Sequence, residues 1–460
     1  MKKSKLLWLL LFFSVALYAQ PHITGKIEID KQRGFIKCAF TLSKIPQIEA
    51  YSILLNKGMN ITYFKDLNGE LLDYDGYYDG KVEGEAIAYV LGDNASSPQK
   101  LPTTFSIDYV GAFPVYKNEY NSFDFKGNIA INEKTLRAAE QTKWYPVLYD
   151  KKNDKMIHSY TYDLHITTKD SRTVFVNGSA PKKGSEVQLT STKAHPLLLF
   201  VGDYNYASYK GDYILNSDIS EETSRFIFKN IEKIKSYYAT RLELAFTDHI
   251  YLMNHESVQK SKEGSSWGFN TYPTFAFTGI DFKDLVAEKN RFSEGTLHFF
   301  GHEFGHNYFG FNVMSGPLSW FWMESFAEYL SFGVASDLGS QSFLKDVLLY
   351  HVNVIKEGTF VPLSDIKNKK EIGENYRYSL GPLLLQCFED HFGKKQMNAI
   401  LKALLKTAGS ETLTLNTLQK AAMQSGIDEK AYAKFYTRYI ANKKFKEHII
   451  QSIEAKYGSN

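Results

Sequence analysis

The stretch LHFFGHEFGH, residues 297 to 306, constrains the fold of this chain more than any other feature. It contains three histidines, each four residues after the last, and side chains four residues apart lie on one face of an α-helix. His302, Glu303 and His306 have the form H-E-x-x-H. Two imidazoles one turn apart can bind a single ion, and neutral imidazole is a good zinc ligand. The stretch therefore predicts a helix that carries a metal site.

Glu303 decides which two histidines bind the metal. It directly follows His302 and is turned about 100° around the helix, so it flanks the ion, where it can take a proton from an attacking water molecule. A pair of His298 and His302 would instead have Phe299 in the position of the base. Only His302 and His306 are in phase with Glu303, and we interpret His298 as a packing or supporting residue.

A second helical pattern, WFWMESFAEYL, supplies a carboxylate. A catalytic zinc ion takes three protein ligands and keeps one position open. Glu324 follows His306 after 17 intervening residues, and the loop between them contains Gly316 and Pro317. That loop is long enough to lay the second helix beside the first. Glu328 comes one turn later, where a carboxylate can hold the outer ring nitrogen of a ligand histidine and fix its tautomer.

HEFGHNYFG followed by WMESFAEYL resembles the aminopeptidase N group of the gluzincin zinc metallopeptidases. The resemblance implies one Zn²⁺ ion held by His302, His306 and Glu324, although the loop before Glu324 is one residue shorter than is usual in the group. Downstream, YRYSLGPLLLQCFEDHFG resembles the segment in which a tyrosine hydroxyl donates to the oxyanion of the tetrahedral intermediate. The resemblance therefore implies that Tyr378 donates to the oxyanion, with Tyr376 as the alternative donor.

The segment just before the aromatic strand departs from the family. A Gly-x-Met-Glu-Asn segment precedes Trp-Gly there, and its glutamate binds the free amino terminus of the substrate. Here the sequence is KEGSSWGF, with Ser265 and Ser266 in place of Glu and Asn, before Trp267 and Gly268. The predicted strand, residues 267–277, can still pair with an extended peptide. We expect Ser265, Ser266, Trp267 and Gly268 to face the substrate.

The pattern of the chain predicts an α+β multidomain protein. Residues 20–207 contain alternating strands such as FIKCAFTL and YDLHITT, separated by Gly, Asn, Asp and Ser turns, which predict a β-sandwich or similar all-β domain. Residues 208–460 are expected to form a mainly helical catalytic domain, which the resemblance implies to be thermolysin-like. WYPVLYD, FVNG and LLLFVGDY extend the resemblance into the N-terminal domain. We expect no further C-terminal helical domain.

Residues 1–19 have the lysines, apolar run and final small residue of a signal peptide, which predicts export to the periplasm or the extracellular space. We expect no membrane span after its removal. The net charge of +3 and the scattered lysines do not indicate a nucleic-acid partner. Cys38 and Cys387 each lie in an apolar run and are expected to be buried free thiols.

These observations predict an exported zinc metallopeptidase that acts on a peptide or protein. An aminopeptidase with an atypical anchor for the amino terminus is the first reading, because of the resemblance. An endopeptidase or another gluzincin hydrolase is the alternative, because the expected anchor is absent. The non-enzymatic alternative is a zinc-bearing binding protein that has lost catalysis, and the complete set of His302, Glu303, His306, Glu324 and Tyr378 argues against it.

Overall fold

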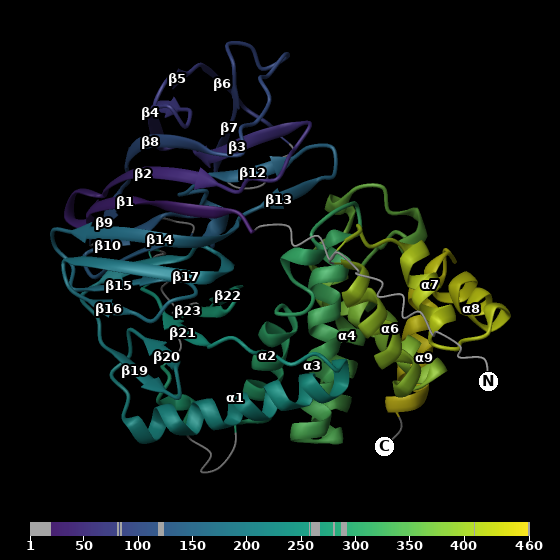
Figure 1. The fold of residues 1–460 in the computed structure, drawn as a ribbon. Coiled ribbons are helices and arrows are strands. Elements are labelled where there is room, and N and C mark those ends of the chain that lie inside the picture. Colours follow the sequence, from purple (N-terminus) through teal and green to yellow (C-terminus); the bar gives the residue numbers. More distant parts are fainter. Residues whose placement is uncertain are drawn as a thin grey trace, which may run out of the picture.

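A computed structural model describes residues 20–80, 82, 85–117, 124–256, 258, 267–278, 281–286, 292–408 and 410–458. The N-terminal half forms β-sheets, and the C-terminal half is mainly helical (Figure 1). This arrangement confirms the predicted α+β class. The predicted signal peptide, residues 1–19, lies outside the described residues. Within the described ranges, no helix combines the length and the apolar character needed to cross a membrane.

The N-terminal region is a β domain built from three sheets. In its strands apolar residues alternate with polar ones, as in Phe35–Ser43, where Ile36, Cys38, Phe40 and Leu42 are buried. The seven-stranded sheet has the order β17 (Glu186–Pro196), β14 (Ser159–Thr168), β1 (His22–Asp30), β2 (Phe35–Ser43), β8 (Phe105–Ala112), β4 (Met59–Lys65) and β5 (Leu71–Leu72).

Two smaller sheets complete this domain. The six-stranded sheet has the order β16 (Lys182–Lys183), β15 (Thr173–Val176), β18 (Leu199–Gly202), β11 (Thr135–Ala138), β10 (Ala130–Asn132) and β9 (Val115–Tyr116). The five-stranded sheet has the order β13 (Lys155–Ile157), β12 (Val147–Asp150), β3 (Tyr51–Asn56), β7 (Ala86–Leu91) and β6 (Tyr74–Tyr77). The segment WYPVLYD lies in their common core, where Trp144 Nε1 donates to Leu197 O at 3.0 Å.

A fourth sheet joins the β domain to the helices. Its order is β19 (Tyr206–Tyr209), β20 (Asp212–Leu215), β21 (Tyr251–Asn254), β23 (Thr274–Thr278) and β22 (Trp267–Thr271). One hydrophobic cluster contains Phe200 of β18 and Tyr251 of β21, so the core continues between the two regions. The predicted division between residues 207 and 208 stays a prediction.

The predicted single strand over residues 267–277 is wrong in one respect. The chain reverses at Tyr272 and Pro273, and β22 pairs antiparallel with β23, with Thr271 opposite Thr274. Proline has no N–H to donate to a sheet, so it favours a turn at this point. The result is a hairpin whose outer strand, β22, is the last strand of the sheet.

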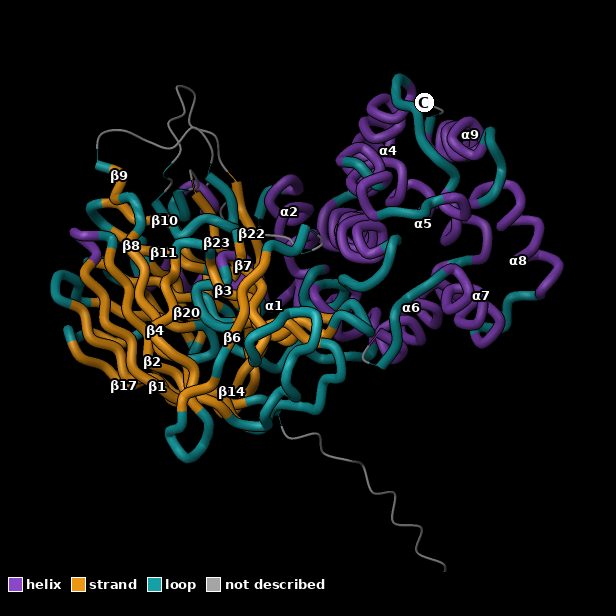
Figure 2. Tube along the Cα trace, turned by 90° about the horizontal axis from the view of Figure 1, so that it is seen from above, coloured by secondary structure: helices purple, strands orange, loops and turns teal. Residues whose placement is uncertain are grey.

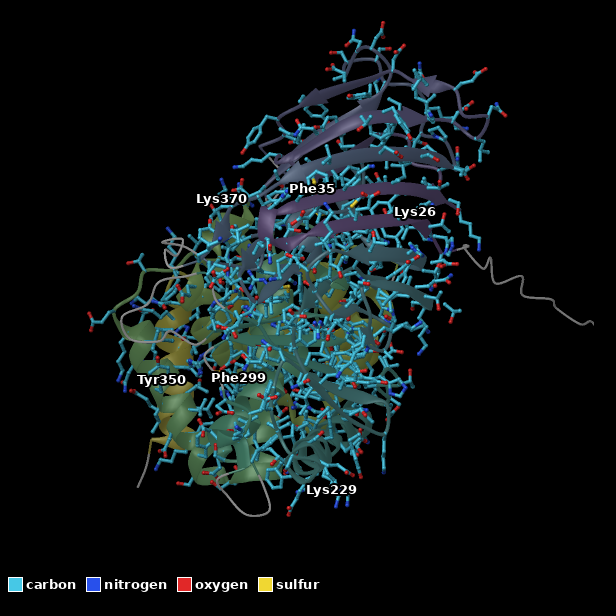
Figure 3. All side chains as sticks on the ribbon, turned by 90° about the vertical axis from the view of Figure 1, so that its left-hand side faces the viewer. Lys26, Phe35, Lys229, Phe299, Tyr350 and Lys370 are labelled. Carbon is cyan, nitrogen blue, oxygen red and sulfur yellow. The ribbon has the colours of Figure 1, made fainter. Side chains whose placement is uncertain are left out.

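Helix α1 (Glu221–Leu242) begins after Ser220, whose side chain accepts a hydrogen bond from Thr223 N, and runs below the fourth sheet in Figure 1. Figure 2 shows the remaining helices to one side of the strands. They are α2 (Glu294–Gly305), α3 (Phe326–Val334), α4 (Gln341–Lys356), α5 (Gly381–Phe392), α6 (Lys394–Ala408), α7 (Leu415–Gln424), α8 (Glu429–Phe435) and α9 (Phe445–Tyr457). In Figure 3, Phe35 and Lys26 mark the β domain, and Phe299 of α2 and Tyr350 of α4 mark the helical part.

Candidate active site

Helix α2 begins at Glu294, directly after Ser293. Ser293 caps it by accepting a hydrogen bond from Thr296 N at 3.1 Å. Two of its glycines, Gly301 and Gly305, let α3 pack closely against it. A Cβ on Gly305 would lie 2.8 Å from Ala327 Cα, and one on Gly301 would lie 3.0 Å from Val334 Cβ. This close approach brings the α3 segment within reach of the histidines on α2.

Glu324 and Tyr378 both lie in π-helical turns. The turn η5 (Phe321–Ser325) leads directly into α3 and carries Glu324, and the turn η9 (Tyr376–Leu380) leads into α5 and carries Tyr378. Such turns insert an extra residue into a helix and are frequent at functional sites. The predicted metal ligand Glu324 and the predicted donor Tyr378 are therefore both carried by locally widened helical turns.

The structure brings His302, His306 and Glu324 together into a candidate metal site. One ligand atom from each lies within 4.8 Å of the others. His302 Nε2 and His306 Nε2 are 3.2 Å apart, and Glu324 Oε2 lies 3.5 Å from the first and 3.3 Å from the second. Two imidazole nitrogens and one carboxylate oxygen match the ligands of a catalytic zinc site.

Hydrogen bonds behind the site fix which ring nitrogens face the cluster. His302 Nδ1 donates to Glu328 Oε2 at 2.7 Å, and His306 Nδ1 donates to Phe309 O at 3.3 Å. Both Nε2 atoms therefore face the centre of the cluster and are the ring nitrogens left to bind a cation. Among the described residues, Glu324 Oε2 is buried and has no hydrogen-bond partner. Three acceptors that face one another require a cation, so the residues fit a bound metal ion.

The charges of the metal-free cluster are strongly coupled. Burial alone would raise the pKa of Glu324, but the imidazoles of His306 and His302 outweigh it and lower that pKa. Burial would lower the pKa of His302, but the carboxylates of Glu324 and Glu328 raise it well above its usual value. Without metal, the cluster therefore holds a proton where the ion would bind.

Glu303 lies on the same turn of α2 as the two histidines and is 8% exposed. Asn270 of β22 donates from Nδ2 to the backbone carbonyl of Glu303 at 2.9 Å and to Asn307 Oδ1 at 3.2 Å. The helix that carries the predicted base is thus tied to the edge strand. A peptide paired with β22 would lie beside α2.

Tyr378 and Tyr376 are clearly distinguished. The Tyr378 ring lies 5.9 Å from the His302 ring, whereas Tyr376 is 2% exposed and packs against Phe360. Burial first, and then the charge of Glu324, raise the pKa of Tyr378. Its hydroxyl therefore keeps its proton at neutral pH and can donate it in a hydrogen bond.

The predicted substrate-facing residues are only partly described. Ser265 and Ser266 lie outside the described residues. Trp267 opens β22, with its ring 5.0 Å from the ring of His255 and 5.5 Å from that of Phe269. Gly268 is paired with Phe277, and a Cβ on Gly268 would lie 2.9 Å from that ring.

Sequence patterns did not single out His351. It lies on α4, is 6% exposed, and its Nε2 is 3.2 Å from Glu328 Oε1. Its place between the buried Leu348 and Val352 on a helical pattern would have marked it as an inward-facing histidine. His298, interpreted as packing or supporting, also contacts Glu328, with Nε2 3.2 Å from Oε1.

Neither a family model nor a curated protein matches the sequence. Solved structures match it over most of its length. The M1 zinc metallopeptidase of Deinococcus radiodurans is 12% identical, with a TM-score of 0.59 over 91% of this chain and 94% of that chain. A mutant of that enzyme bound to a Tyr-Ser-Ala substrate is 14% identical, with a TM-score of 0.59 over the same shares. Native yeast LTA4 hydrolase is 13% identical, with a TM-score of 0.57 over 95% of this chain and 67% of that chain.

The chain therefore has the fold of the M1 zinc metallopeptidases. At these identities the likeness establishes the fold, and it confirms the fold that the sequence resemblance implied. The activity is argued from the site itself.

Proposed function

We propose that the protein is an exported zinc-dependent peptidase. The observation that carries the proposal is the cluster of His302, His306 and Glu324, whose three acceptor atoms face one another beside Glu303. The neighbours of the same fold support it, because their names identify them as zinc metallopeptidases and one holds a peptide substrate. Export rests on the signal-like pattern of residues 1–19.

Each residue has a distinct part in the proposed hydrolysis. Bound Zn²⁺ would supply a Lewis acid that polarises the scissile carbonyl and makes a water molecule more acidic. Glu303 takes a proton from the attacking water and passes it to the leaving nitrogen. Tyr378 donates its O–H to the carbonyl oxygen as negative charge develops there. Strand β22 aligns the substrate backbone through its outer edge.

Aminopeptidase activity is the first form of this proposal, because of the resemblance of the two motif segments to the aminopeptidase N group. Endopeptidase activity is the second. It is favoured by Ser265 and Ser266, which stand in place of the Glu-Asn pair whose glutamate binds a free amino terminus in that group. Neither serine can pair with an ammonium group as a carboxylate does.

One experiment tests the function and separates its two forms. The purified protein is given a peptide library in two versions, with free and with acetylated amino termini, and products are identified by mass spectrometry. Loss of single residues from free peptides alone supports an aminopeptidase, and internal cleavage of acetylated peptides supports an endopeptidase. Zinc content is measured on the same sample. Stoichiometric zinc without cleavage of any peptide would support the binding-protein alternative and contradict the proposal.

A further inference from the structure

The Glu328 carboxylate is surrounded by three imidazoles. His302 Nδ1 lies 2.7 Å from Oε2, and the Nε2 atoms of His298 and His351 each lie 3.2 Å from Oε1. Glu328 is 6% exposed. Only His302 belongs to the candidate metal site, so the other two histidines form a layer behind it that the proposed reaction does not use.

The donors and acceptors of this layer can be assigned. A carboxylate accepts hydrogen bonds from the ring nitrogens around it, so the Nε2 atom of His351, 3.2 Å from Oε1, is the donor to Glu328 and its Nδ1 atom is left as an acceptor. That nitrogen lies 3.0 Å from Ser379 Oγ. The Ser379 hydroxyl therefore donates to His351.

These bonds form one continuous path, which we call the Glu328 network: Ser379 donates to His351, and His351 and His302 both donate to Glu328. Its members come from η9, α4, α3 and α2. The network begins beside Tyr378 and ends on a metal-site histidine. It links the two halves of the proposed catalytic machinery through buried side chains.

The turn that carries Tyr378 is held on both sides of that residue. Before it, Ser325 Oγ donates to the carbonyl oxygen of Arg377 at 2.8 Å. After it, Ser379 is held by His351. Directly after the turn, α5 begins at Gly381 and approaches η5 closely, since a Cβ on Gly381 would lie 2.1 Å from Ser325 Oγ. The Ser325 contact fixes η9 against the Glu324 segment, and the Ser379 contact fixes it against α4.

We propose that His351 and Ser379 are positioning residues: through the Glu328 network they place the Tyr378 hydroxyl and orient His302 as one rigid unit. The proposal rests on the proposed peptidase function. Groups that support a metal ligand or a transition-state donor must hold it to within a fraction of an ångström. His298 shares the same carboxylate oxygen with His351, but its other ring contacts are to Phe332 and Phe343 rather than to the Tyr378 turn.

A double-mutant cycle tests the link to Tyr378. Ser379→Ala removes one oxygen atom and is expected to lower kcat about tenfold without changing KM. A tenfold loss is the lower limit for removal of a contact that supports a metal ligand. In a Tyr378→Phe background the same change is expected to cost clearly less, because there is no hydroxyl to misplace and only the link to His302 is left. His298→Gln is the matched control, and its effect should be equal in both backgrounds. A Ser379→Ala loss of the same size in Tyr378→Phe would overturn the proposal.

A second measurement does not depend on turnover. Zinc is replaced by Co²⁺, and the visible absorption spectrum reports the geometry of the metal ligands. His351→Asn, whose side chain is too short to bridge Glu328 and Ser379, is expected to shift the cobalt bands and to speed zinc dissociation about tenfold. An unchanged spectrum and an unchanged dissociation rate in a folded His351→Asn protein would contradict the link to His302.

The two measurements separate this proposal from the proposed function. If the zinc-loaded wild type cleaves no peptide, the peptidase proposal fails, and the cobalt spectra still decide whether His351 acts on His302. If the wild type cleaves peptides but neither variant changes kcat or the cobalt spectrum, the function stands and the positioning role is refuted. Should His351→Asn fail to fold, Ser379→Ala still decides the link to Tyr378 by kinetics.

Discussion

Replacing Glu303 with Gln is the perturbation that tests the proposed chemistry most selectively. Glutamine has the same shape but cannot take a proton. The three ligand atoms of the metal site come from other residues, so zinc should remain bound. General base catalysis contributes about 100- to 10,000-fold to rate, which corresponds to about 3–5 kcal/mol.

The structure favours the upper part of that range. The carboxylates of Glu324 and Glu328 both lie within 3.5 Å of metal-site histidines, so neither is available as a substitute base. We expect kcat to fall by about 1,000-fold or more with KM little changed. Glu294→Gln, in the first turn of the same helix, serves as the matched control and should keep its activity.

The assay combines steady-state hydrolysis of a peptide that the wild type cleaves with zinc analysis of each dialysed sample. Glu303→Gln should contain as much zinc as the wild type and melt at the same temperature. A loss in kcat below tenfold, with zinc still bound, would refute the role of Glu303 as the base. A large loss accompanied by missing zinc would show that the residue acts on the metal instead.

Three further predictions follow from the same geometry. Tyr378→Phe should lower kcat about 100- to 1,000-fold while zinc content and KM stay near wild type, and an unchanged kcat in peptide hydrolysis would exclude the oxyanion role. Zinc binding should release about one proton near pH 7 and weaken as the pH falls, because the raised pKa of His302 keeps a proton in the metal-free site. Calorimetry in buffers of different ionisation enthalpy measures the number of protons released, and zinc binding without proton release would contradict the prediction. Gly305→Ala should lower the free energy of unfolding by about 1–3 kcal/mol, because the added Cβ would lie 2.8 Å from the backbone of Ala327. A melting temperature equal to that of the wild type would show that α2 and α3 can move apart without loss of stability.

The sequence predicts the parts of the site that lie on one helix. The positions of His302, Glu303 and His306 relative to one another follow from helix geometry alone. Strands such as β2 can also be predicted from local geometry, since side chains alternate along a strand and this puts Ile36 and Cys38 on one buried face. Local geometry therefore accounts for the elements and the metal motif.

Contacts between distant segments could not be predicted in this way. His351 reaches Glu328 because α4 packs against the site helices, and no fixed spacing in the sequence expresses that packing.

The reversal of the chain at Pro273 is different, because it is a local feature that the proline itself indicates. The preference for Tyr378 over Tyr376 depends on which side of η9 faces the metal site, because the π-helical turn alters the usual helical spacing.

The most direct test of the central claim is reconstitution. The protein is stripped of metal with a chelator, dialysed, and titrated with Zn²⁺ while peptide hydrolysis is followed. We expect no activity in the stripped protein and full activity at one equivalent of zinc, with neither recovery nor tight zinc binding in His306→Ala. Peptide hydrolysis that persists in the stripped protein, or that His306→Ala retains in full, would contradict a zinc peptidase built on this site.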